Sequence, residues 1–143
     1  MSPLDSPPAE SAAQKRWGDA LNAGFVVLPV VLLRHQKDLR LSDGELVVLL
    51  NVVASWWYSG KLPFPSTQTI ATRMGVTPRT VQRHLISLEK KGLLKHLPRS
   101  HVPETDVLVV RYDPSGLVEL LKTFGAQFAP RQAKARAKEG VPA

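Results

Sequence analysis

The sequence contains no cysteine, and its acidic residues are outnumbered. Without cysteine, disulfide bonds and thiolate metal sites are excluded. Asp and Glu number 12 against 19 Lys and Arg, which gives a formal net charge of +7 at pH 7. A basic excess of this kind favours a polyanionic partner, and nucleic acid ahead of a membrane surface.

Long hydrophobic runs are also missing. The apolar run FVVLPVVLL (25–33) contains Pro29 and is far shorter than the ~20 residues that a membrane-spanning helix needs. The N-terminal residues MSPLDSPPAESAAQKRW lack the apolar stretch of a signal peptide. We therefore expect a cytoplasmic protein without a membrane partner.

Patterns typical of catalysis and metal binding are absent as well. The sequence shows no Ser-His-Asp pattern, Gly-rich phosphate loop or nucleotide motif. No spacing brings three histidine or carboxylate ligands together on a metal. The close acid pair Asp43 and Glu45 falls in a predicted first helical turn, where capping and the helix dipole explain it. We expect no enzymatic activity, no cofactor and no metal, and we find no evident small-molecule effector.

The chain is predicted to form one mainly α domain with a small β-hairpin, spanning residues 23–128. The Pro-, Ala- and Ser-rich residues 1–22 predict a disordered arm. Residues 129–143 carry four basic residues and one acid and predict a disordered tail, which would neutralise the phosphates of a nucleic acid without selecting a sequence.

The N-terminal half of the domain is unusually apolar. Residues 24–28 (GFVVL) predict a short strand, and Pro29 fits the first turn of a helix reaching about Asp38. The next helix begins after Ser42 as N-cap and is apolar nearly all round, so it must be buried on two sides. Its second side packs on the N-terminal segment or on a second subunit. We expect a homodimer, and the candidate self-association residues are Phe25, Val27, Val30, Trp56 and Trp57.

Residues 66–91 predict a helix-turn-helix. Ser66 is the expected N-cap of a first helix that Gly75 ends. Thr77 is the expected N-cap of the second helix, with Pro78 in its first turn and Gly92 after its end. Two candidate strands, 93–99 and 107–113, follow as a hairpin, and residues 114–128 predict a last amphipathic helix.

The second helix of this motif has two different faces. At about 100° per residue, Val81, Leu85 and Leu88 cluster on one side. The opposite side carries Arg79, Arg83, Ile86 and Lys90, with Gln82 beside them. Arg reaches the acceptors of guanine bidentately and Gln pairs with adenine. Arg79, Gln82 and Arg83 are therefore the candidate base-reading residues in the DNA major groove.

Basic charge is concentrated around the same helix. Residues 72–99 hold seven Lys and Arg and one acid, Glu89, whereas an ordinary solvated face mixes both signs. Hydroxyl, amide and cationic side chains here suit phosphate contacts. The candidate phosphate-binding residues are Thr67, Gln68, Thr77, Thr80, Lys90, Lys95 and Arg99.

The stretch FPSTQTIATRMGVTPRTVQRHLISLEKKGLL (64–94) resembles the winged helix-turn-helix of bacterial regulators. The resemblance implies an α+β winged-helix fold over about residues 41–113, with the wing at 93–113. Residues 25–56 are also similar in layout to the N-terminal domain of DnaD-like replication proteins and of plasmid or phage initiators. In those proteins the leading strand and helix commonly contribute to self-association. The second, C-terminal domain of DnaD is not seen here, so primosome-type work by this chain alone is not expected.

Three functions remain open. The first is a transcriptional regulator, a repressor that occupies an operator in double-stranded DNA. The second is a plasmid or phage replication initiator or accessory protein. Either would place the protein on the bacterial nucleoid or on a plasmid. The third is a protein-interaction module that uses the winged fold without DNA. A low basic charge would favour this function, but the chain carries a net charge of +7.

Overall fold

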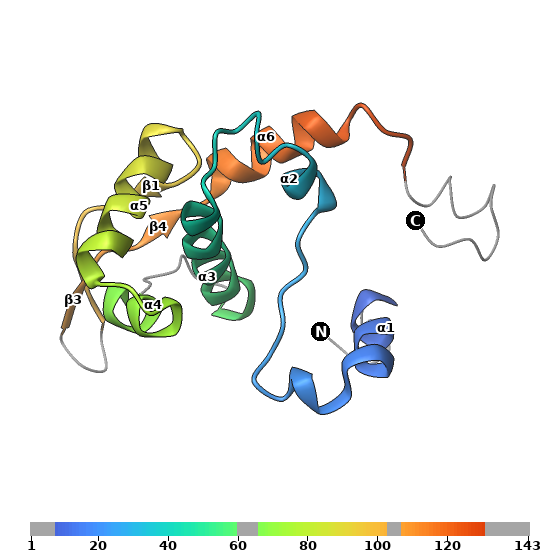
Figure 1. Cartoon of the computed structure of the whole chain (residues 1–143), viewed down its shortest axis with the longest axis horizontal. Helices are drawn as coiled ribbons and strands as arrows, with labels where there is room; N and C mark the ends of the chain where they lie inside the picture. The colour runs from blue at the N-terminus through green and yellow to red at the C-terminus, as the bar shows by residue number, and fades with distance from the viewer. Residues whose placement is uncertain (1–7, 60–65, 103–106, 131–143) are drawn as a thin grey trace.

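The computed structural model describes residues 8–59, 66–102 and 107–130, and Figure 1 shows a mainly helical chain with short antiparallel strands. The predicted winged helix-turn-helix fold is confirmed. The elements in chain order are α1 (Pro8–Trp17), η2 (Gly18–Leu21), α2 (Val30–Arg34), α3 (Asp43–Ser59), α4 (Thr67–Met74), α5 (Pro78–Lys90), β1 (Lys95–His96), β2 (Ser100–Val102), β3 (Val107–Val109), β4 (Tyr112–Asp113) and α6 (Ser115–Gly125).

The N-terminal segment differs from the prediction in two respects. Residues 8–21 form α1 and η2 instead of a disordered arm, because Pro8 is followed by helix-favouring Ala, Glu, Gln, Lys and Arg. The strand predicted at 24–28 is wrong. Among the described residues this segment is an extended connector with no strand beside it (Figure 1), and a strand needs a ladder partner.

Helix α2 is shorter than predicted, and α3 begins as predicted. Pro29 is the N-cap of α2 rather than part of its first turn, and α2 ends at Arg34. At the start of α3 the Glu45 amide donates to Ser42 Oγ, while Glu45 Oε1 accepts from the Ser42 amide, both at 3.1 Å. This reciprocal pair is a capping box, which fixes the first turn of α3.

The helix-turn-helix forms at the predicted boundaries. Ser66 Oγ accepts from the Thr69 amide at the start of α4, and Thr77 Oγ1 accepts from the Thr80 amide at the start of α5. Gly75 ends α4 with φ of 71°, a left-handed conformation that suits glycine. These three local signals set the angle at which α5 leaves α4.

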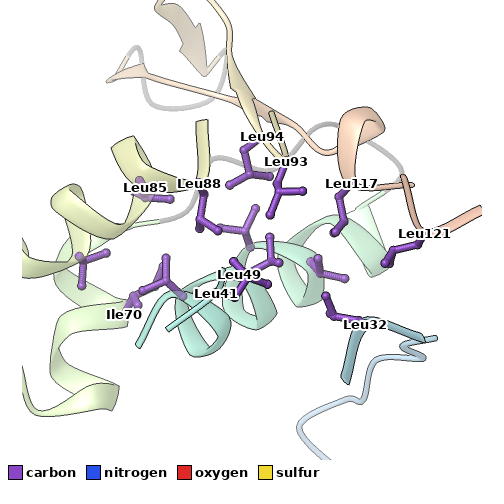
Figure 2. Packing of buried hydrophobic residues seen from close by; sticks show 14 of the residues in the cluster. Leu32, Leu41, Leu49, Ile70, Leu85, Leu88, Leu93, Leu94, Leu117 and Leu121 are labelled. Atoms are coloured by element: carbon purple, nitrogen blue, oxygen red, sulfur yellow. The ribbon is translucent and has the colours of Figure 1, made fainter. Parts of the chain in front are cut away.

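The core lies between α3 and the elements that surround it. Figure 2 shows leucines of α5, of the segment after it and of α6 converging over α3, with Ile70 from α4 and Leu32 from α2. Buried side chains hold α5 against both α3 and α4, so the position of α5 is set by the domain core. The buried apolar residues are Leu32, Leu41, Val48, Leu49, Val52, Val53, Ile70, Ala71, Val81, Leu85, Leu88, Leu93, Leu94, Leu117 and Leu121.

The wing consists of two short antiparallel pairs. Strand β1 pairs with β4 through Lys95 opposite Asp113, and β2 pairs with β3 through His101 opposite Leu108. The tip, 103–106, lies outside the described residues. Helix α6 follows the wing directly, and its Leu117 amide donates to Leu93 O at 3.2 Å. This bond ties α6 to the turn between α5 and β1.

Gly116 allows this close approach, and we expect Gly116→Ala to destabilise the domain. A Cβ at position 116 would lie 2.1 Å from Gly92 O, a backbone atom that can give way only if the turn or α6 shifts. The expected loss is about 1–2 kcal/mol in the free energy of unfolding, as for other overpacked sites. Urea unfolding measures it. Gly125→Ala in the same helix meets nothing within 4 Å and is the matched control. Equal stability of the two variants would contradict the close approach.

Candidate nucleic-acid interface

Helix α5 presents the three candidate base-reading residues to solvent. Arg79, Gln82 and Arg83 are all exposed, whereas Val81, Leu85 and Leu88 on the opposite face are at most 2% exposed. The helical wheel derived from sequence therefore matches the burial of α5 residue by residue. This arrangement leaves the guanidinium groups and the amide free to contact a ligand.

The N-terminus of α5 is held firmly. Besides capping the Thr80 amide, Thr77 Oγ1 lies 3.1 Å from Thr80 Oγ1. Further along, the half-buried ring of His84 packs over Gly44 at the start of α3, where a Cβ would come within 2.7 Å of its Nε2. His84 therefore spaces α5 from α3 and is not on the exposed stripe. Such support is what a DNA-reading helix needs to keep its orientation.

The candidate phosphate-binding residues are not equally accessible. Gln68 and Thr77 are exposed, while Thr67 and Thr80 are half-buried. Because Thr77 Oγ1 already caps α5 and also contacts Thr80 Oγ1, these two hydroxyl groups have less capacity for a phosphate than their sequence position suggests. Three further candidates are exposed cations at the end of α5 and in the wing: Lys90, Lys95 and Arg99.

Lys91 is half-buried and pairs with groups of the domain itself, which its place in the basic run does not reveal. Its Nζ donates to Glu45 Oε2 and to Arg40 O, both at 2.6 Å, and Ser87 Oγ donates to the same Glu45 oxygen at 2.7 Å. The Glu45 side chain is 9% exposed. Burial raises the pKa of Glu45, but hydrogen bonds from Lys91, Ser87 and Ser42 outweigh it and lower the pKa to about 2.

Two more charged residues of the basic region have partners within the fold. Arg73 donates through Nη1 to Asn51 Oδ1 at 2.9 Å, which links α4 to α3. Glu89, the single acid between 72 and 99, accepts from the His96 amide at 2.8 Å and contacts its ring Nδ1. The acid therefore faces the base of the wing. Among the described residues, the exposed cations Arg79, Arg83, Lys90, Lys95 and Arg99 have no ion-pair partner.

The candidate self-association residues are split between the surface and the core. Val27 and Val30 are exposed, the latter at 63%, and Leu33 beside them is exposed too. Phe25 is half-buried, and Trp56 is half-buried and packs against the core. The side chain of Trp57 and residues 131–143 of the predicted tail (129–143) lie outside the described residues. Val27, Val30 and Leu33 are thus apolar side chains left exposed in the connector before α2 and in α2 itself.

No helix within the described ranges is both long and apolar enough to cross a membrane.

Comparison with known proteins relates the chain to helix-turn-helix domains. The model of a helix-turn-helix domain family matches residues 39–94, the segment from just before α3 to the start of the wing. No curated protein matches the chain.

A solved structure extends this relationship beyond the helix-turn-helix. The crystal structure of the N-terminal domain of DnaD protein from Geobacillus kaustophilus is similar with a TM-score of 0.52 and 31% sequence identity. The similarity covers 79% of this chain and 94% of that domain. A helix-turn-helix of this kind indicates DNA binding. With residues 39–94 matching a helix-turn-helix domain, the chain belongs to the family of the N-terminal domain of DnaD.

Proposed function

We propose that this protein binds double-stranded DNA sequence-specifically, with α5 in the major groove and without catalysing a reaction. The observation that carries the proposal is the exposed, acid-free stripe of α5 with Arg79, Gln82 and Arg83 in its first half. Residues near the N-terminus of a recognition helix are the ones that reach base edges. The arginines would contact guanine and the glutamine adenine. Lys90, Lys95 and Arg99 would contact phosphates on either side.

Two roles fit this binding mode. A repressor would occupy an operator, and a replication initiator or accessory protein would occupy an origin. The relationship to the DnaD domain supports the replication role, whereas no feature of the described residues favours repression in particular. Chromatin immunoprecipitation of the tagged protein in its own host tests the difference. Enrichment at an origin with repeated sites supports replication, and enrichment at promoters without the origin supports repression.

Self-association is the second part of the proposal, since Val27, Val30 and Leu33 leave apolar surface exposed. A two-fold dimer would present two α5 helices to half-sites about one DNA turn apart. We expect sedimentation velocity at tens of micromolar to show a dimer, and Val30→Lys to shift it to monomer while circular dichroism stays unchanged. A wild-type protein that sediments as a monomer, and binds DNA as one protomer per site, would contradict this.

Wing cations are expected to add affinity without selecting a sequence. Lys95 and Arg99 are exposed and lie on strand β1 and just before strand β2. Lys95→Ala and Arg99→Ala should each weaken binding to specific and unrelated DNA by the same factor. Each should also flatten the plot of log affinity against log salt by roughly 0.9 of a unit, the value for one phosphate contact. Fluorescence anisotropy over a salt series measures both effects, and a changed base preference would show that the wing reads a groove.

A further inference from the structure

Ile86 is the one aliphatic side chain on the exposed stripe of α5. It is 51% exposed, and the other residues of the stripe (Arg79, Gln82, Arg83 and Lys90) are polar or basic and also exposed. The apolar face that holds α5 in the core is on the other side, where Val81, Leu85 and Leu88 are buried. Ile86 therefore lies outside the buried face that anchors α5 in the core.

The major groove contains one apolar group that such a side chain can recognise. Thymine carries a 5-methyl group there, and apolar side chains contact it. Ile86 follows Arg83 by three residues, which corresponds to a rise of about 4.5 Å along the helix. Successive bases on one strand are separated by about 3.4 Å. Side chains at 83 and 86 therefore come within reach of neighbouring base pairs when α5 lies in the groove.

We propose that Ile86 contacts the 5-methyl group of a thymine next to the guanine that Arg83 contacts, and that it selects an A·T pair there. The inference rests on the proposed binding of α5 in the major groove and names a further specificity-determining residue. It concerns a methyl group, so it can be tested separately from the guanine contacts.

The experiment uses DNA in which single thymines are replaced by deoxyuridine. Deoxyuridine keeps the base pairing and the O4 acceptor and removes the 5-methyl group alone. Starting from the best site found by binding-site selection, each thymine is replaced in turn, and affinity is measured by fluorescence anisotropy. The proteins are wild type, Ile86→Ala and, as control, Val76→Ala, an exposed aliphatic in the turn before α5.

For wild type we expect one replacement per half-site to weaken binding about fourfold. Burying one methylene-sized group is worth about 0.8 kcal/mol, and 1.4 kcal/mol is a factor of ten. Ile86→Ala should lose all sensitivity to that replacement. Because the dimer loses the contact in both half-sites, it should also bind the unmodified site about fourteenfold more weakly. Val76→Ala should keep the sensitivity. The thermal stability of the Ile86→Ala protein should not change, since Ile86 is half exposed.

Two results would overturn the inference: a wild type indifferent to every replacement, or an Ile86→Ala protein that keeps the same sensitivity. If guanine selection through Arg83 persists in either case, the thymine contact alone is wrong and the proposed function stands. If no base is selected by any protein, the proposed function itself is wrong.

Discussion

Arg83→Ala should reduce affinity for the specific site ten- to hundredfold and leave binding to unrelated DNA much less affected. Arg83 lies on the exposed side of α5, opposite the buried Val81, Leu85 and Leu88, and has no ion-pair partner among the described residues. A bidentate arginine–guanine contact is worth about 1–3 kcal/mol of discrimination, and 1.4 kcal/mol corresponds to a factor of ten. Arg79→Ala, one helical turn earlier, should act in the same direction.

Unrelated DNA should still bind because Lys90, Lys95 and Arg99 remain. The matched control is Arg16→Ala, which removes the same charge from an exposed position on α1. It should lower both affinities slightly and equally. Fluorescence anisotropy with a specific and a scrambled duplex gives the comparison. If Arg83→Ala lowers the affinities for the specific and the scrambled duplex by the same factor, Arg83 contacts phosphate and reads no base.

Lys91→Met should cost about 3 kcal/mol in the free energy of unfolding at neutral pH. Removing the lysine leaves the Glu45 carboxylate, with a side chain 9% exposed, without its cation, and it deletes the bond to Arg40 O. Removing one partner of a buried ion pair costs about 3–5 kcal/mol in the free energy of unfolding. We expect the lower end of this range because the Lys91 side chain is 26% exposed. Urea unfolding at pH 7 measures the loss.

The adjacent lysine provides the control. Lys90 is exposed and has no ion-pair partner among the described residues, so Lys90→Met should change stability by no more than about 0.5 kcal/mol. Lys90→Met should instead weaken DNA binding. Two neighbouring lysines would then be separated into a structural and a DNA-binding residue. Equal stability of the two variants would show that the contact with Glu45 contributes nothing.

The same pair predicts how stability depends on pH. The pKa of Glu45 is about 2 in the folded chain, below its ordinary value of 4.5, so the folded state favours the carboxylate. Its contribution is complete above about pH 4.5 and is lost as the pH falls toward 2. Urea unfolding between pH 5 and pH 2 should show a steeper loss for wild type than for Lys91→Met. Parallel curves would mean that Lys91 does not set this pKa.

The helix-turn-helix could be predicted from sequence because its signals are local. Ser66 and Thr77 act as N-caps within three residues, and Gly75 adopts the left-handed conformation on its own. The two faces of α5 follow from helical periodicity, so the exposure of Arg79 and Arg83 was also predictable. The family relationship to the DnaD domain agrees with the layout of residues 25–56.

The errors concern features that depend on distant partners. Residues 24–28 have the composition of a strand, but no strand lies beside them in the described chain. Lys91 falls within the basic run of the sequence, and its partner Glu45 is 46 positions away. In the sequence, capping and the helix dipole explain Glu45 without a lysine. The connection between Arg73 and Asn51 was hidden for the same reason. Helical periodicity predicts on which side of a helix a residue lies, but it does not predict which distant residue its side chain contacts.

Binding-site selection from a random duplex library, carried out in parallel with wild type and Arg83→Ala, shows whether Arg83 reads a base. We expect a wild-type consensus with guanine in each half-site, and an Arg83→Ala consensus in which one guanine per half-site is no longer selected. An identical consensus from the two proteins would contradict base reading by Arg83. If Arg79→Ala and Arg83→Ala both also bind DNA as tightly as wild type, α5 is not the DNA-binding surface, and the winged fold serves protein interaction instead.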